Sequence, residues 1–355
     1  MREIFLGRIV NWSALILIAG LVMTEACSTD PGRKVDRLFR AYRGDVPGAS
    51  VMVIRHGQPI LTKSFGLADI GHKIPVTDST NFRLASLTKQ FTAMSIMILK
   101  ERGKLDYSMN LCQVFPDFPA YGRQVSVRNL LQHTSGLIDY EDLIPDSATI
   151  QVRDSDVLRM MIAQDSTYFA PGSAFRYSNS GYAVLAMIVE KVSGRSFATF
   201  LKENIFLPLG MNNSVAFEEG ISTVPVRAFG YSVEDDSVLF SDQSLTSAVL
   251  GDGGIYTSVT DLFKWDQALY TEELVTTATL NEAFTPALDN YGFGWWIDAY
   301  KGHRRIRHYG STCGFRTAIL RYPESEFTVI ILTNRREPDV TRLAEKLTDI
   351  YLISE

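Results

Sequence analysis

A serine and a lysine three residues apart are the first pair in this sequence whose spacing could do chemistry. Ser86 and Lys89 lie in the stretch NFRLASLTKQFTAMSIMILK, residues 81–100. Residues three apart lie on one face of a helix, so the amine could touch the hydroxyl. Burial disfavours the charged form of an amine. A buried Lys89 could therefore take the serine proton and make Ser86 a nucleophile.

The residues around this pair favour a buried helix that begins near Ser86. One apolar stripe is formed by Phe91, Met94, Ile98 and Leu99. Gly103 follows as a stop signal. A serine in the first turn would feel unpaired N–H groups and the positive end of the helix dipole. The alternative is that Ser86 is a helix cap and Lys89 a solvated charge. Against it, a lysine is seldom buried in so apolar a helix unless its amine has a partner.

A second stretch whose residues could take part in catalysis is FRYSNSGY, residues 175–182. Pro171 and Gly172 precede it and a helical pattern follows, which places Tyr177 and Asn179 on a tight loop. A phenol close to an ammonium can relay a proton. An asparagine amide can hold a substrate carbonyl or the lysine. The alternative is a turn with a structural tyrosine and an Asx cap.

The third stretch is RHYGSTCGF, residues 307–315, which we expect to join two strands. Gly310 permits a close approach of the backbone, and the N–H of Ser311 could point into a cleft. Acyl transfer needs two N–H donors where the oxyanion forms, and the Ser86 N–H would be the other. His308 is either a substrate contact or a residue at the end of a strand.

In this chain order the three stretches resemble the serine β-lactamase and penicillin-binding-protein superfamily. The flanking sequence is similar to its class C-type branch, which includes β-lactamases, D,D-peptidases, D-aminopeptidases and carboxylesterases. The resemblance covers roughly residues 47–334 and rests on the stretches LLQHTSGL, FAPGSAFRYSNSG, LGMNNS, GDGGIYTSVTD and YGFGWW and on residues 314–334.

The resemblance implies a role for each of these residues. Ser86 would be the acylated nucleophile and Lys89 its proton acceptor. Tyr177 would be the general acid and base, and Asn179 would orient the substrate and the lysine. The N–H groups of Ser86 and Ser311 would form the oxyanion hole. No cofactor is implied.

The sequence departs from the β-lactamase pattern at the third motif, where His308-Tyr309-Gly310 replaces Lys-Thr-Gly. A histidine is mostly neutral near pH 7, so the anchor for a β-lactam carboxylate should be weaker. This favours a D,D-peptidase or esterase type over an efficient β-lactamase. The alternative is a penicillin-binding or cell-wall-sensing protein that acylates without turnover. Gly-x-Ser-x-Gly is absent, which argues against an α/β-hydrolase esterase.

The element pattern predicts an α/β (α+β) fold. Strand composition marks residues 49–55, 59–65, 291–297, 304–308, 316–322 and 328–333, and helical patterns mark residues 35–42, 127–132, 155–164, 181–192, 197–205, 260–269 and 339–353. Strands at both ends predict one antiparallel sheet built from the N- and C-terminal parts, flanked by helices, with an inserted mostly helical subdomain.

We place a single β-lactamase-like domain at residues 35–355. Its sheet lobe spans about 35–80 and 286–355, and its helical lobe about 81–285. A ligand cleft is expected between the lobes. The expected ligand is a small-molecule or peptide substrate with an acyl group, of which a cell-wall peptide is one example.

The N-terminus has the pattern of an export signal. Arg2 and Arg8 precede an apolar run over residues 14–23, which is too short for a good spanning helix. A small residue and then Cys27 follow, as at a bacterial lipoprotein cleavage site. We therefore expect a signal peptide over residues 1–27 and a tether at 28–34. The protein would be periplasmic or anchored to the membrane by a lipidated Cys27; ordinary signal cleavage and an uncleaved anchor are the alternatives.

Composition excludes other classes of function. The chain has 355 residues, 46% hydrophobic and 21% charged, with a formal net charge of −5. No cluster of basic residues has the size that nucleic-acid binding needs. No cysteine and histidine spacing suits zinc, so we expect no metal. Cys112 and Cys313 are far apart, and we expect two unpaired thiols, with a disulfide as the alternative.

Overall fold

The computed structural model describes residues 30–235 and 237–353. The expected signal peptide and Cys27 lie outside these residues. The chain divides into a unit that ends at Arg40 and a main unit from Ala41 onward. In the first unit, α1 (Pro31–Leu38) begins where the Asp30 side chain accepts the Gly32 N–H at 2.9 Å. The helix expected from residue 35 therefore begins earlier, within the expected tether, because Asp30 and Pro31 form a helix start.

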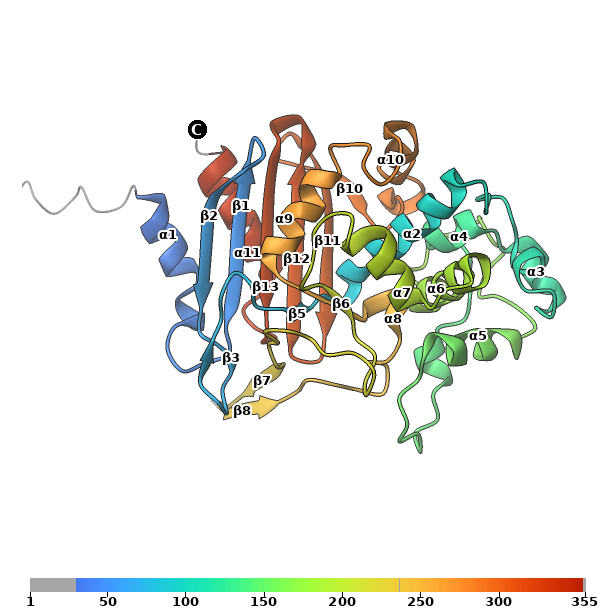
Figure 1. The fold of residues 1–355 in the computed structure, drawn as a ribbon, viewed down its shortest axis with the longest axis horizontal. Coiled ribbons are helices and arrows are strands. Elements are labelled where there is room, and N and C mark those ends of the chain that lie inside the picture. The colour runs from blue at the N-terminus through green and yellow to red at the C-terminus, as the bar shows by residue number, and fades with distance from the viewer. Residues whose placement is uncertain (1–29, 236, 354–355) are drawn as a thin grey trace, which may run out of the picture. The chain divides into compact units, whose positions relative to one another are not determined.

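A six-stranded antiparallel sheet in the order β10-β11-β12-β13-β1-β2 lies in the main unit (Figure 1). Its strands are β1 (Ala49–Arg55), β2 (Gln58–Phe65), β10 (Trp296–Tyr300), β11 (His303–Thr312), β12 (Phe315–Tyr322) and β13 (Phe327–Thr333). β1 pairs with β13 along its whole length, with Ala49 opposite Thr333 and Arg55 opposite Phe327. The prediction of one antiparallel sheet built from both ends of the sequence is confirmed.

Two helices cover opposite faces of this sheet. Arg321 of β12 donates to Asp266 of α9 (Val259–Ala268) at 2.6 Å, and both side chains are buried. The hydroxyl of the next residue, Tyr322, donates to Thr348 of α11 (Val340–Thr348) at 3.2 Å. Successive residues of a strand point to opposite faces, so α9 and α11 lie on opposite sides of the sheet, as Figure 1 also shows.

The helix that follows Ser86 is the buried centre of the helical region. α2 (Lys89–Glu101) is buried from Lys89 to Leu99. Phe91 stacks on Trp265 of α9 with ring centroids 4.2 Å apart, and the Trp265 indole N–H donates to Gln90 at 3.0 Å. The other helices are α3 (Leu111–Val114), α4 (Val127–Leu131), α5 (Asp154–Ile162), α6 (Asn179–Ser193), α7 (Phe197–Leu201), α8 (Leu250–Gly253) and α10 (Thr277–Ala283). α2 packs against α6 and α8, which ties Lys89 to both.

Short elements complete the fold. The short strands were not expected from the sequence, whereas Arg40–Tyr42, Lys202–Phe206 and Asp349–Ile353 fall almost wholly within the helices expected at residues 35–42, 197–205 and 339–353. The strands are β3 (Leu67–Asp69), β4 (Ile74–Pro75), β5 (Phe82–Arg83), β6 (Val215–Ala216), β7 (Tyr231–Glu234), β8 (Ser237–Phe240) and β9 (Ile255–Thr257). The 3₁₀ turns are Arg40–Tyr42, Ala85–Thr88, Ala120–Gln124, Tyr140–Leu143, Leu288–Asn290 and Pro323–Ser325; Lys202–Phe206 and Asp349–Ile353 are π-helical. Strands of two to four residues are too short to show a periodic pattern.

Two strand predictions were wrong in their bounds. The strand expected from residue 291 begins only at Trp296, because the chain turns at Gly294, which has φ +78°. A Cβ there would lie 2.8 Å from the Lys89 carbonyl oxygen, so this turn lies directly against α2. The strand expected to end at residue 308 continues to Thr312, so the third motif lies on β11 itself. Cys112 and Cys313 are free thiols, as expected, and both are partly exposed.

Candidate active site

Ser86 lies in the 3₁₀ turn Ala85–Thr88 that leads directly into α2. Ala85 has φ +51°, a left-handed conformation that costs an L-residue roughly 1–2 kcal/mol. Strain of this kind is common where a structure must aim a functional group. The first N–H groups of a helix have no acceptor within it, so the Ser86 N–H is free to meet a ligand. Ser86 is partly exposed, whereas Leu87 and Thr88 are buried.

Lys89 is fully buried and holds the Ser86 hydroxyl at a distance of 3.1 Å. Its Nζ also donates to Asn179 Oδ1 at 2.9 Å and to the Asp252 carbonyl oxygen at 3.0 Å. All three partners are neutral acceptors, and no described carboxylate forms an ion pair with this lysine. The amine is therefore fixed from two sides against the serine and is placed to exchange a proton with it.

Tyr177 lies beside this pair. Lys89 Nζ is 4.9 Å from the centroid of the Tyr177 ring. The ring of His133 packs against the Tyr177 ring, with the two centroids 4.2 Å apart. Burial holds the pKa of His133 well below its usual value, and its Nδ1 accepts the Ser178 N–H at 3.1 Å. His133 is thus a neutral support that orients Tyr177, and the sequence analysis did not identify it.

His308 is buried on β11 and is held neutral. Its Nδ1 donates to the Tyr309 carbonyl at 2.8 Å and its Nε2 accepts the Tyr291 hydroxyl at 3.1 Å. Burial, and then the charge of Lys89, lower the pKa of His308 to about 3. One hollow of about 220 Å³ is lined by Ser86, Tyr177, Trp296, His308, Tyr309, Gly310 and Ser311. Tyr177 and Ser86 therefore line the same crevice. None of the described residues that line it carries a positive charge where the β-lactamase pattern has a lysine.

Gly310 lets β11 approach the Ser86 turn. A Cβ at this position would lie 2.1 Å from the Leu84 carbonyl oxygen and 2.2 Å from Thr317 Oγ1. Thr312 and Phe315 pair across a two-residue turn. Because hydrogen-bonded and non-hydrogen-bonded pairs alternate along an antiparallel ladder, the backbone N–H of Ser311 points away from β12. On that side the ladder with β10 ends at Arg307. The Ser311 N–H is therefore directed past the end of β10, toward the hollow that it shares with Ser86.

A second, smaller hollow on the other side of Ser86 contains acidic residues that the sequence analysis missed. It has a volume of about 60 Å³ and its walls include Arg83, Tyr140, Glu141, Asn179, Asp252 and Ser311. Glu141 Oε1 accepts the Asn179 side-chain N–H at 2.9 Å. The Asp252 carboxyl accepts the Tyr140 hydroxyl at 3.1 Å, and burial raises the pKa of Asp252 to about 6.

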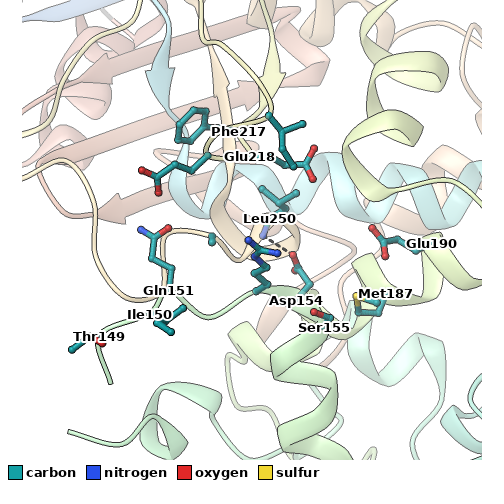
Figure 2. A pocket seen from close by; sticks show the side chains of 14 residues that line it. Thr149, Ile150, Gln151, Asp154, Ser155, Met187, Glu190, Phe217, Glu218 and Leu250 are labelled. Carbon is teal, nitrogen blue, oxygen red and sulfur yellow. Dashed lines mark hydrogen bonds between the residues drawn. The ribbon is translucent and has the colours of Figure 1, made fainter. Parts of the chain in front are cut away.

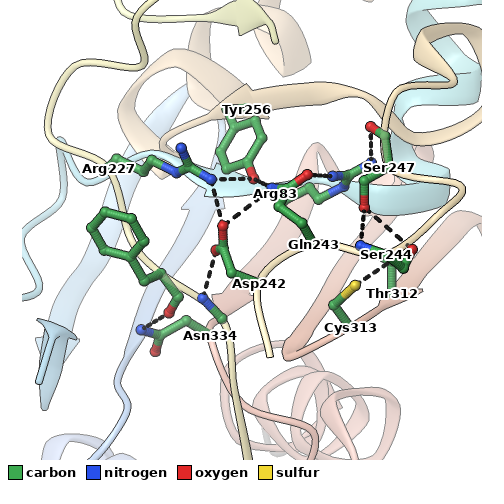
Figure 3. A network of polar contacts seen from close by, with 12 residues as sticks. Arg83, Arg227, Asp242, Gln243, Ser244, Ser247, Tyr256, Thr312, Cys313 and Asn334 are labelled. Carbon is green, nitrogen blue, oxygen red and sulfur yellow. Dashed lines mark hydrogen bonds and ion pairs between the residues drawn. The ribbon is translucent and has the colours of Figure 1, made fainter. Parts of the chain in front are cut away.

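Arg83 belongs to a polar network behind this hollow (Figure 3). Its guanidinium donates to the Ser247 carbonyl at 2.8 Å and to Gln243 Oε1 at 3.2 Å. Gln243 in turn donates to Asp242 at 3.1 Å, which also accepts from Arg227. The hydrogen bonds of the Arg83 guanidinium therefore hold the segment 242–247 next to the site.

A cavity of about 530 Å³ lies elsewhere, and none of the predicted site residues lines it (Figure 2). Its wall includes Asp154, whose carboxylate accepts the N–H groups of Leu250 and Gly251 at 2.8 and 2.9 Å. Burial raises the pKa of Asp154 to about 7. Asp154 thereby holds α8, and α8 supplies the Asp252 carbonyl that contacts Lys89.

An antiparallel sheet covered by helices on both faces, beside a helical region that starts with Ser-x-x-Lys, defines the β-lactamase and transpeptidase class of α/β folds. A family model described as Beta-lactamase matches residues 35–351, and the chain belongs to this family. Penicillin-binding protein 4* of Bacillus subtilis (strain 168) is 36% identical over 309 residues, 81% of this chain and 68% of that protein.

Solved structures agree with this assignment. The octameric penicillin-binding protein homologue from Pyrococcus abyssi has a TM-score of 0.80 at 26% identity, covering 91% of this chain and 76% of that chain. The D-amino acid amidase from Ochrobactrum anthropi SV3 has a TM-score of 0.77 at 24% identity, covering 92% and 98%, and shows the same fold. The chain therefore has a hydrolase fold of the serine β-lactamase and transpeptidase superfamily.

Two features are absent from residues 30–235 and 237–353. No helix there has the length and apolar character that crossing a membrane requires. No group of three or more histidine, cysteine, aspartate or glutamate side chains is placed there to hold a metal ion.

Proposed function

We propose that this protein is an exported serine hydrolase that cleaves an amide or ester bond through an acyl-enzyme on Ser86. The observation that carries the proposal is the 3.1 Å contact between the buried Lys89 amine and the Ser86 hydroxyl. A lysine without an ion-pair partner, held against a hydroxyl at a helix start, is the arrangement that activates a serine. Export is supported by the N-terminal pattern that ends at Cys27, with the protein periplasmic or lipid-anchored.

In the acylation step Ser86 Oγ forms a bond to the substrate carbonyl carbon as its proton passes to Lys89. The oxyanion lies between the N–H groups of Ser86 and Ser311. The bond to the leaving group then breaks, and the leaving group takes a proton from Tyr177, which Lys89 replaces.

In the deacylation step Lys89 takes the phenol proton, and Tyr177 receives a proton from the attacking water. The proton on Lys89 returns to Ser86 Oγ as the acid product leaves. Each group therefore ends the cycle in its starting state.

The state of His308 supports a D,D-peptidase or esterase type over an efficient β-lactamase. A β-lactam needs a cation for its carboxylate, and a histidine with a pKa of about 3 supplies none at neutral pH. The names of the relatives, penicillin-binding proteins and an amidase, are compatible with such chemistry.

Labelling with a fluorophosphonate probe tests the proposal. We expect the probe on the peptide that contains Ser86, and we expect Ser86→Ala to remove labelling and lower esterase activity on the order of a thousandfold or more. Ser108→Ala, at an exposed serine that lines neither hollow beside Ser86, is the matched control and should label normally. Retained activity in a folded Ser86→Ala variant would contradict the proposal.

Turnover separates the proposal from its alternative, a penicillin-binding or cell-wall-sensing protein. With a p-nitrophenyl ester and a chromogenic cephalosporin we expect steady release of product from the ester and slow turnover of the cephalosporin. A single burst, followed by no steady rate with any substrate, would favour the sensing protein.

A further inference from the structure

The charges around Ser86 are unequally distributed between its two hollows. On the His308 side the imidazole is neutral, and Arg307 is paired with Asp298 at 2.8 Å. On the other side, the charged side chains that line the hollow are Arg83, Glu141 and Asp252, and among these described residues only Glu141 is exposed. A substrate that approaches Ser86 therefore meets a carboxylate rather than a cation.

One oxygen of the Glu141 carboxylate can still accept a hydrogen bond. Its Oε1 takes the Asn179 N–H, and the residues that the structure describes give Oε2 no hydrogen-bond partner. Asn179 uses its own oxygen for Lys89, so this amide holds both the catalytic amine and Glu141 in place. Asn179 thus fixes the position of the Glu141 carboxylate relative to Lys89.

The other charges near this hollow are already engaged. Arg83 directs its guanidinium to Gln243 and Ser247, outside the hollow. Asp252 is buried, bonded to Tyr140, and has its pKa raised to about 6. Lys89 is buried behind Ser86 with three acceptors. Only Glu141 remains to recognise a charged group on a substrate.

The size of the hollow suits a small cation. Its volume of about 60 Å³ exceeds the roughly 10–15 Å³ that a cavity needs to hold one water molecule. An ammonium and the carbon that bears it fit such a space. The hollow of about 220 Å³ on the other side of Ser86 can take a larger group.

From these observations we propose that Glu141 binds the ammonium group of the substrate. The substrate class is then an amide or ester of an amino acid, or of a peptide, whose free amino group lies next to the scissile carbonyl. Substrates that present a carboxylate at this point are disfavoured. This inference rests on the proposed function, since it takes Ser86 as the nucleophile.

Matched p-nitroanilides of phenylalanine, with the amino group free or acetylated and in both D and L forms, test this inference. We expect the better enantiomer of the free amine to exceed its acetylated counterpart in kcat/KM by about tenfold or more. The preference should fall as pH rises through the amine's own pKa, near 8 for an α-amino group, because only the ammonium pairs with a carboxylate.

Glu141→Gln isolates the charge, because the amide keeps an oxygen for Asn179. We expect the ratio of free to acetylated kcat/KM to fall about tenfold or more. Asp142→Asn removes the neighbouring carboxylate, which accepts from Tyr168, and should leave the ratio unchanged. An unchanged ratio in Glu141→Gln, or equal losses for both substrates, would overturn the inference.

The experiments distinguish a failure of the ammonium site from a failure of the proposed hydrolase function. If the fluorophosphonate labels Ser86 and p-nitrophenyl acetate is hydrolysed, but acetylated anilides are preferred, the hydrolase stands and the ammonium site is wrong. If neither labelling nor ester hydrolysis depends on Ser86, the proposed function fails and the ammonium site fails with it.

Discussion

Replacing His308 with glutamine tests the electrostatics of the site through the stability of the fold. Burial and the nearby Lys89 lower the pKa of His308 to about 3, against 6.5 in an unfolded chain. As pH falls, the unfolded state therefore binds this proton first. Stability from the neutral imidazole is complete above pH 6.5 and is lost at about 1.4 kcal/mol per pH unit as pH falls toward 3. The full loss is roughly 5 kcal/mol.

Urea unfolding of wild type and His308→Gln at pH 7.5 and pH 5 measures this effect. At pH 7.5 the wild type should be more stable, because the variant disturbs the bonds to Tyr291 and Tyr309. By pH 5 the difference should narrow by about 2 kcal/mol. His56→Gln, at an exposed histidine, is the control. A difference that stays constant with pH would refute the reasoning, and with it the argument against a carboxylate anchor.

Two further substitutions test positions that support the site. Gly310→Ala places a Cβ 2.1 Å from the Leu84 carbonyl oxygen, so β11 must move and esterase kcat/KM should fall about a hundredfold while circular dichroism shows a folded chain; activity within threefold of wild type would contradict this. The raised pKa of Asp154, about 7, gives stability that is complete below pH 4 and lost as pH rises to 7. The advantage of wild type over Asp154→Asn should therefore shrink by roughly 3 kcal/mol from pH 4 to pH 7, and a constant difference in urea unfolding would count against it.

The parts of the fold that sequence predicts well are those with a local pattern. β1 and β13 are nearly continuous apolar runs, as central strands covered on both faces should be. The helix expected at residues 260–269 is α9, and Ser258 caps its start by accepting the Asp261 N–H at 3.2 Å. The start of β10 was missed because its preceding turn is imposed by the contact between Gly294 and α2, which no local pattern records.

The same distinction applies to the site. The pair Ser86 and Lys89 could be predicted because a spacing of three residues is itself a geometric statement. Glu141 and Asp252 could not, since their partners lie 38 and 163 residues away along the chain. Short acidic segments in loops are common on any surface, so their presence carries no signal until the fold places them beside Asn179 and Lys89.

The buried titratable groups around Ser86 act on stability in opposite directions. His308 and His133 have lowered pKa values, so each makes the fold less stable as pH falls below 6.5. Asp154 and Asp252 have raised pKa values and make it more stable over the same range. Their effects offset one another between about pH 4 and pH 6.5, so the wild type should show a shallower pH dependence than the single variants reveal. A site that buries an amine beside a serine can in this way remain stable with only a few charged groups near it.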